Sequence, residues 1–229
     1  MAEADAPTAT ARIAVWDLPT RVFHWSLVGL ISLAWWSGEE ERFDLHFWAG
    51  YAILFLVIFR LLWGMIGSST ARFANFVRGP AAILSYLRDS GGSKVGHSPI
   101  GALSVLGLLG VVALMVATGL VQAEREHGEW IVGPLAHLVS EDISEAAHDL
   151  HELLFNVLLG LIGLHIAAIL FYRLVLGKAL VGAMMTGSGT FPEGTEPMRR
   201  APLWRLIICI LLSLAVTSWI IGGAPALWG

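Results

Sequence analysis

Four histidines in apolar stretches are the side chains of this sequence best suited to binding a metal. His151 and His165 lie fourteen residues apart in one such stretch, and His24 and His46 each lie near the start of another. Fourteen residues are almost four turns of an α-helix, so the two imidazoles of that pair share one face, about 21 Å apart. Imidazole is costly to place in hydrocarbon and is kept there mostly for a function. The pattern predicts two metal centres, stacked across a membrane.

The composition is that of an integral membrane protein. Hydrophobic residues make up 56% of the 229 residues and charged residues only 14%, whereas a soluble domain has about 25% charged residues. The single cysteine excludes an internal disulfide and a cysteine-held iron–sulfur cluster. Apolar stretches of suitable length predict five membrane-spanning helices, at residues 19–37, 45–66, 100–121, 147–176 and 204–221.

The charges of the connecting segments predict how the chain crosses the membrane. Segments 67–99 and 172–205 each carry three more basic than acidic residues, whereas segments 38–45 and 123–146 carry acidic excesses of three and five. Basic loops face the cytoplasm. The N-terminus is therefore expected in the cytoplasm and the C-terminus on the outer side. The stretch 73–87 is expected to lie on the inner membrane surface as a short helix or to be a solvated loop, and 186–197 is expected to be a flexible linker.

Depth along the predicted helices divides the histidines into two pairs. His24 and His165 lie toward the cytoplasmic side, and His46 and His151 lie toward the outer side. Two imidazoles from different helices at one depth could bind a haem iron axially, bind zinc together with further ligands, or relay protons. An axial pair needs only the two imidazoles and an apolar slot between helices, which these stretches supply.

A zinc site is conceivable only at the outer end of the fourth predicted helix. Asp149 and Glu152 flank His151 there, and His148 precedes them, whereas no carboxylate or cysteine lies near the inner pair. Zinc needs three or four ligands. His148 is the alternative to His151 as the histidine that shares a helix face with His165. It lies about 100° off that face, against about 40° for His151, so His151 is preferred.

Several sequence stretches occur in a recognisable order. They are VWDLPTRVFHW at 15–25, HFWAGY at 46–51, RFANFVRGP at 72–80 with GHSP at 96–99, and HE at 151–152 followed by His165. Together, over about residues 13–186, the chain resembles the family of bacterial cytochrome b561 and the b-type cytochrome of nickel–iron hydrogenases. The resemblance implies an all-α integral membrane protein, a four-helix transmembrane di-haem bundle, to which this chain adds a fifth, C-terminal transmembrane helix.

The resemblance also implies the ligands and the domain limits. His24 and His165 would ligate an inner haem b, and His46 and His151 an outer haem b, while no catalytic residue is implied. Arg21 and His97 match positions near the inner face, where they would meet haem propionates or a quinone headgroup. The expected domains are a cytoplasmic arm 1–18, the cytochrome domain 19–186, a linker 187–203, and the fifth helix with a periplasmic tail 204–229.

The function implied is electron transfer, in the bacterial inner membrane, between the quinone pool, for example ubiquinone, and a periplasmic redox partner. The outer segments are acidic, so we expect the partner to be a basic c-type cytochrome rather than an anion or a nucleic acid. Three alternatives stay open. They are a superoxide:quinone oxidoreductase, a haem-bearing anchor subunit of a hydrogenase-like complex, and a haem-free metal transporter that uses these histidines.

Overall fold

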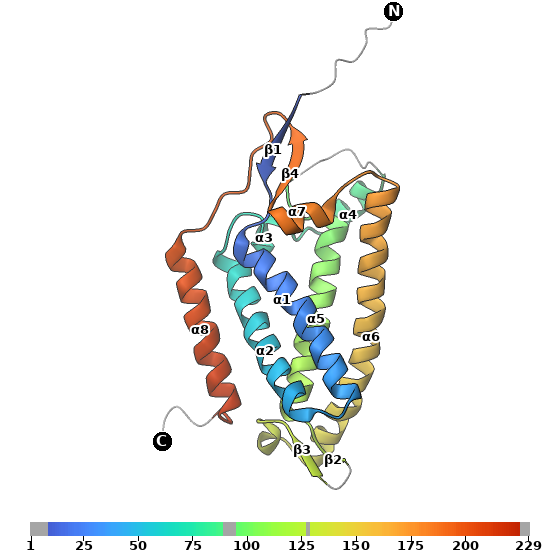
Figure 1. Ribbon diagram of the computed structural model, residues 1–229, viewed down its shortest axis with the longest axis vertical. Helices are drawn as coiled ribbons and strands as arrows, with labels where there is room; N and C mark the ends of the chain where they lie inside the picture. The colour runs from blue at the N-terminus through green and yellow to red at the C-terminus, as the bar shows by residue number, and fades with distance from the viewer. Residues whose placement is uncertain (1–8, 89–94, 127–128, 225–229) are drawn as a thin grey trace, which may run out of the picture.

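Long helices lie at all five stretches predicted from hydropathy (Figure 1). The computed structural model describes residues 9–88, 95–126 and 129–224. The long helices are α1 (Leu18–Glu39), α2 (Phe43–Ile66), α5 (Pro99–Val121), α6 (Glu141–Leu174) and α8 (Leu203–Ile221). Four of them, α2, α5, α6 and α8, are long and apolar enough to cross a membrane. The 22 residues of α1 give it a length of about 33 Å, but its passage through the membrane remains a prediction.

Helix α1 begins at Leu18, one residue before the predicted range 19–37, within an Asp-Leu-Pro sequence. The Asp17 carboxylate accepts a hydrogen bond from the Thr20 amide at 2.9 Å, and Pro19 lies in the first turn. The other oxygen of Asp17 accepts a hydrogen bond at 3.0 Å from the indole Nε1 of Trp63, near the end of α2. The Asp17 carboxylate therefore caps the N-terminus of α1 and links it to α2.

Two short antiparallel ribbons lie at opposite ends of the bundle (Figure 1). Strand β1 (Thr10–Ala14) pairs with β4 (Ser188–Pro192), and strand β2 (Ala123–Glu126) pairs with β3 (Glu129–Val132). We call the end with β1 and β4 the ribbon end and the end with β2 and β3 the hairpin end. The flexible linker predicted at 186–197 is thus partly a strand, because the N-terminal arm supplies a partner that local composition does not reveal.

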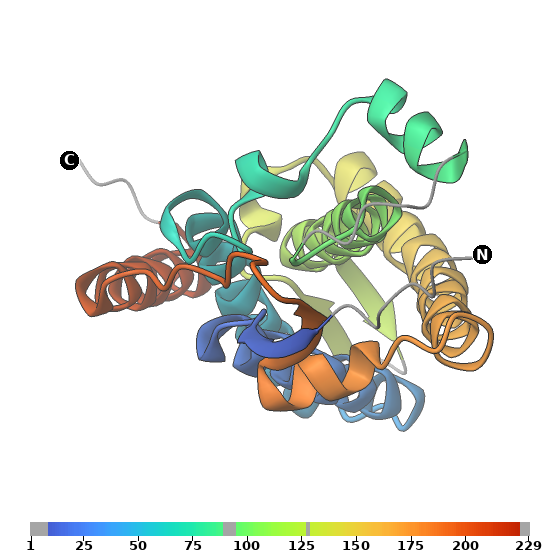
Figure 2. The same cartoon turned by 90° about the horizontal axis from the view of Figure 1, so that it is seen from above.

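The segment 73–87, expected to be either one short helix on the inner membrane surface or a solvated loop, is helical but not a single helix. It forms two helices, α3 (Phe73–Phe76) and α4 (Pro80–Arg88). The break falls just before Pro80, where proline disfavours a helical conformation in the residue that precedes it. Helix α4 lies at the edge of the bundle in the view from above (Figure 2). The short helices α7 (Leu180–Thr186) and the 3-10 turn at Ala136–Leu138 have no counterpart in the predictions.

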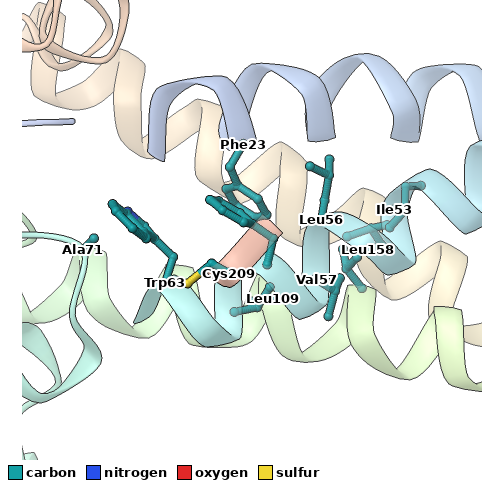
Figure 3. Packing of buried hydrophobic residues seen from close by; sticks show 11 residues of the cluster. Phe23, Ile53, Leu56, Val57, Trp63, Ala71, Leu109, Leu158 and Cys209 are labelled. Carbon is teal, nitrogen blue, oxygen red and sulfur yellow. The ribbon is translucent and has the colours of Figure 1, made fainter. Parts of the chain in front are cut away.

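The apolar core joins all five long helices. Figure 3 shows Phe23 of α1 beside Leu56 and Trp63 of α2, with side chains of α5, α6 and α8 around them. Helix α8 packs along α2 (Figure 2) through a stripe of small residues four apart, Cys209, Ser213 and Thr217. It is fixed at its start too, since Arg205 Nη1 donates to the Ile66 carbonyl at 3.1 Å.

A glycine in the connection between α5 and α6 gives the first testable consequence of this packing. A Cβ atom on Gly133 would lie 2.5 Å from the carbonyl oxygens of Gly119 and Leu120 in α5. We expect Gly133→Ala to destabilise the protein by about 1–3 kcal/mol, because backbone atoms cannot move aside as a flexible side chain can. Thermal unfolding of the detergent-purified protein measures the effect. Gly110→Ala is the control, since nothing lies within 4 Å of its Cβ position, and equal melting temperatures for the two variants would contradict the prediction.

Candidate functional site

His46 of α2 and His151 of α6 face each other near the hairpin end. Their ring centres are 6.2 Å apart, with an angle of 68° between the ring planes. An imidazole nitrogen binds a metal at about 2 Å, and its ring centre lies about 1 Å behind that nitrogen, so two imidazoles on opposite sides of one metal have centres about 6 Å apart. The observed separation therefore suits one metal between the two rings.

Each ring of this pair is held through its Nδ1 atom. The Nδ1 atom of His46 lies 2.9 Å from the Ala34 carbonyl, and Nδ1 of His151 lies 2.9 Å from the Met115 carbonyl and 3.1 Å from the Thr118 hydroxyl. A carbonyl only accepts, so Nδ1 carries the proton in each ring. The lone pair of the other nitrogen, Nε2, is then free to bind a metal, which is how proteins usually orient such histidines.

A cavity of about 490 Å³ adjoins the two rings, within the size range of cofactor pockets. Its apolar wall comes from α1, α2, α5 and α6 and includes Ile31, Trp35, Val112, Val116, Phe155 and Leu158. Glycines keep space beside the imidazoles. A Cβ on Gly38 would lie 3.4 Å from His46, and one on Gly119 would lie 3.3 Å from His151. An apolar slot with two free imidazole nitrogens fits a haem, which needs a flat apolar space and two axial ligands.

His24 of α1 and His165 of α6 form the second pair, toward the ribbon end. The two rings are close enough to interact electrostatically. Nδ1 of His165 lies 3.2 Å from the Ser104 hydroxyl of α5, so this ring is also oriented from one side. Nδ1 of His24 is buried and has no hydrogen-bond partner among the residues that the structure describes. An unpartnered buried nitrogen is costly, so this end of the bundle suits a further polar or metal-bearing group.

His148, the competing histidine, is engaged elsewhere. Its Nε2 lies 2.9 Å from Glu124 and 3.8 Å from Glu152, whereas the His151 ring faces His46. Within the described ranges, no group of three or more His, Cys, Asp or Glu side chains could hold a metal. The zinc site considered for this end therefore gains no support from the geometry.

Arg21 and His97 lie at the ribbon end but in separate settings. The Arg21 guanidinium donates to the carbonyls of Met184 and Met185 and so holds α7 against α1. The His97 ring packs between Trp16 and Phe76, with ring centres 4.5 and 4.4 Å away. Burial, with the Arg60 guanidinium nearby, lowers the pKa of His97 to about 3, so its imidazole is neutral at physiological pH. Contact of Arg21 or His97 with a haem or quinone stays a prediction.

Arg60 is the polar residue that the sequence analysis missed. It is only 2% exposed although it lies within the apolar helix α2. Its Nη1 donates to the Ala71 carbonyl at 3.2 Å, and its guanidinium lies 4.7 Å from the centre of the Phe73 ring. The sequence carried a usable signal, because Arg60 follows His46 by the same fourteen residues that separate His151 from His165.

The fold and the site define a membrane protein whose helices bring imidazoles together in pairs. The sequence matches the family of prokaryotic cytochrome b561 over residues 15–187, and the chain belongs to that family. It is therefore a membrane b-type cytochrome that takes part in electron transfer and binds b-type haem, which confirms the resemblance seen in the sequence. No curated protein and no solved structure matches the chain.

Proposed function

We propose that the protein holds two haems b and carries electrons between the quinone pool and a periplasmic redox protein. His46 and His151 would ligate one haem, and His24 and His165 the other. The main support is the 6.2 Å spacing of the His46 and His151 rings beside an apolar cavity of about 490 Å³. Each of the two rings is also oriented through its Nδ1 atom.

The residues of the chain would act by holding, orienting and enclosing the two groups. A bound haem supplies a one-electron couple of its iron, whose potential depends on axial ligands, hydrogen bonds and burial. Carbonyls of α1 and α5 fix the His46 and His151 rings, and the Ser104 hydroxyl fixes His165. The apolar walls exclude water from the ligands, and helix α6 sets the spacing between the two sites, about 21 Å along its axis.

The charge distribution supports an orientation with the ribbon end in the cytoplasm. The described parts of the basic segments 67–99 and 172–205 both lie at the ribbon end, and basic loops generally face the cytoplasm. The hairpin end would then face the periplasm of the bacterial inner membrane, with α1 as a further span. This end exposes a group of carboxylates, which we call the acidic face: Glu39, Glu40, Asp44, Glu141, Asp142, Glu145, Asp149 and Glu152. Such a surface attracts basic proteins and repels anions, superoxide included.

An optical spectrum with haem and metal analysis tests the proposal most directly. We expect detergent-purified protein to carry two haems per chain and to develop the sharp α-band of b-type haem on reduction with dithionite. A preparation with one haem per chain would reject the second site. A colourless preparation that contains zinc would reject the proposal in favour of a metal transporter.

A further inference from the structure

Helices α2 and α6 each carry two polar residues fourteen positions apart, and these residues lie at the same two heights in the bundle. Both run from the hairpin end to the ribbon end (Figure 1), and they start level, because the rings of His46 and His151 are 6.2 Å apart. Fourteen residues further, α6 carries His165 and α2 carries Arg60. Each step is about 21 Å along the axis and returns to within about 40° of the starting face. Arg60 therefore lies at the level of the His24 and His165 pair.

The Arg60 charge is buried and is only partly compensated. Asp17 interacts with it electrostatically, but the Asp17 oxygens accept their hydrogen bonds from the Thr20 amide and the Trp63 indole rather than from the guanidinium. His97, the other titratable neighbour, is neutral with a pKa of about 3. A guanidinium removed from water in a membrane-spanning helix is costly and is usually retained for a function.

Unsatisfied polar atoms gather around the same end of the bundle. Six buried side-chain atoms of the described residues have no hydrogen-bond partner, and four of them belong to residues toward the ribbon end: Thr20 Oγ1, His24 Nδ1, Arg72 Nε and His97 Nδ1. Arg72 directly follows Ala71, whose carbonyl binds Arg60. The local formal charge is +1, from Arg60 and Arg72 against Asp17.

The surroundings of the other histidine pair, His46 and His151, are acidic rather than basic. Among the residues that line its cavity, the carboxylates Glu39 and Glu152 are the groups that carry a full charge, and no Lys or Arg belongs to that lining. An electron added at that level meets acidic surroundings, whereas one added near Arg60 meets a buried cation. Charges interact strongly in surroundings of low dielectric constant.

We propose that Arg60 supplies a buried positive charge beside the inner haem. This charge stabilises the carboxylates of the haem and the electron that the haem accepts. The reduction potential of the inner haem therefore lies above that of the outer haem. This inference depends on the proposed function, since it requires haem at His24 and His165. Asp17 then acts in the opposite sense, as the charge that limits the effect of Arg60.

Redox titration of the two haems in charge variants tests this role. We expect Arg60→Gln to lower the reduction potential of the inner haem by at least about 59 mV, which is a tenfold change in the equilibrium constant for one electron. The reduction potential of the outer haem should not change. Arg60→Lys keeps the charge and should retain most of the wild-type potential. The two haems are assigned from His46→Ala protein, which should keep only the inner one. Arg205→Gln is the matched control, because it removes a positive charge from the same end of the bundle at the start of α8.

The possible outcomes separate this inference from the proposed function. Wild-type protein without haem at the inner pair rejects the proposed function itself. Two bound haems with an unchanged inner potential in Arg60→Gln reject the role of Arg60 alone, as does an equal fall in Arg60→Lys. If Arg60→Gln does not fold, the Asp17→Asn variant tests the role of Arg60 instead. That variant keeps an oxygen for the Thr20 amide and should raise the inner potential, and a fall or no change would overturn the inference.

Discussion

Replacing His151 by alanine should reduce the haem content from two per chain to one. The expected loss is that of the haem at the hairpin end, because His46 would then have to hold that group without its partner imidazole. The His46→Ala variant should show the same loss, and the double variant should lose no more than either single variant. Haem content per chain and the amplitude of the reduced α-band measure the effect.

The neighbouring His148→Ala variant is the matched control for this experiment. His148 lies three residues from His151, but its Nε2 contacts Glu124, so this variant should keep both haems. A complementary loss, of the other haem, is expected for His165→Ala. Retention of two haems by His151→Ala would contradict the assignment of the pair, and equal haem loss in His148→Ala would mean that the effect reflects general instability.

The rate of electron exchange with a basic c-type cytochrome should fall at least about tenfold as ionic strength rises from low to physiological values. The cause is the acidic face at the hairpin end, which attracts a basic partner over long distances only when salt does not screen it. Replacing Glu141, Asp142 and Glu145 by their amides should reproduce much of the fall at low salt, since all three side chains are exposed. Stopped-flow measurement of haem oxidation or reduction gives the rates.

Arg78→Gln serves as a charge control at the opposite end, because Arg78 is exposed near the ribbon end and should leave the rate unchanged. An acidic partner protein should show the reverse dependence on salt. A rate with superoxide that equals or exceeds the cytochrome rate and does not depend on salt would contradict the prediction and favour the superoxide alternative.

Much of the bundle could be predicted because its determinants are local. Long apolar stretches locate the five helices, and the Asp17 side chain with Pro19 locates the start of α1. The approach of His46 and His151 also follows from simple counting, since helical rise and loop charge place both near one membrane surface. The structure brings these rings together, while their role as ligands stays a prediction.

The remaining features depend on contacts between distant parts of the chain. Backbone carbonyls of Ala34 and Met115 orient two of the imidazoles, and a carbonyl has no signature in the sequence. The Arg21 guanidinium binds carbonyls of α7, a helix that lies more than 150 residues further along the chain. Arg60 is different, because its spacing from His46 is visible in the sequence. An arginine is not a metal ligand, so the pattern of possible ligands does not by itself point to it.

The pairing of β1 with β4 constrains the order in which parts of the protein assemble during synthesis. Strand β1 at residues 10–14 emerges early during synthesis, but its partner at residues 188–192 follows α1, α2, α5 and α6. The first strand therefore cannot pair with β4 until those helices have been synthesised. Pairing over such a separation is slow because a long loop has to close. The ribbon consequently forms late in assembly, only after α1, α2, α5 and α6 are complete.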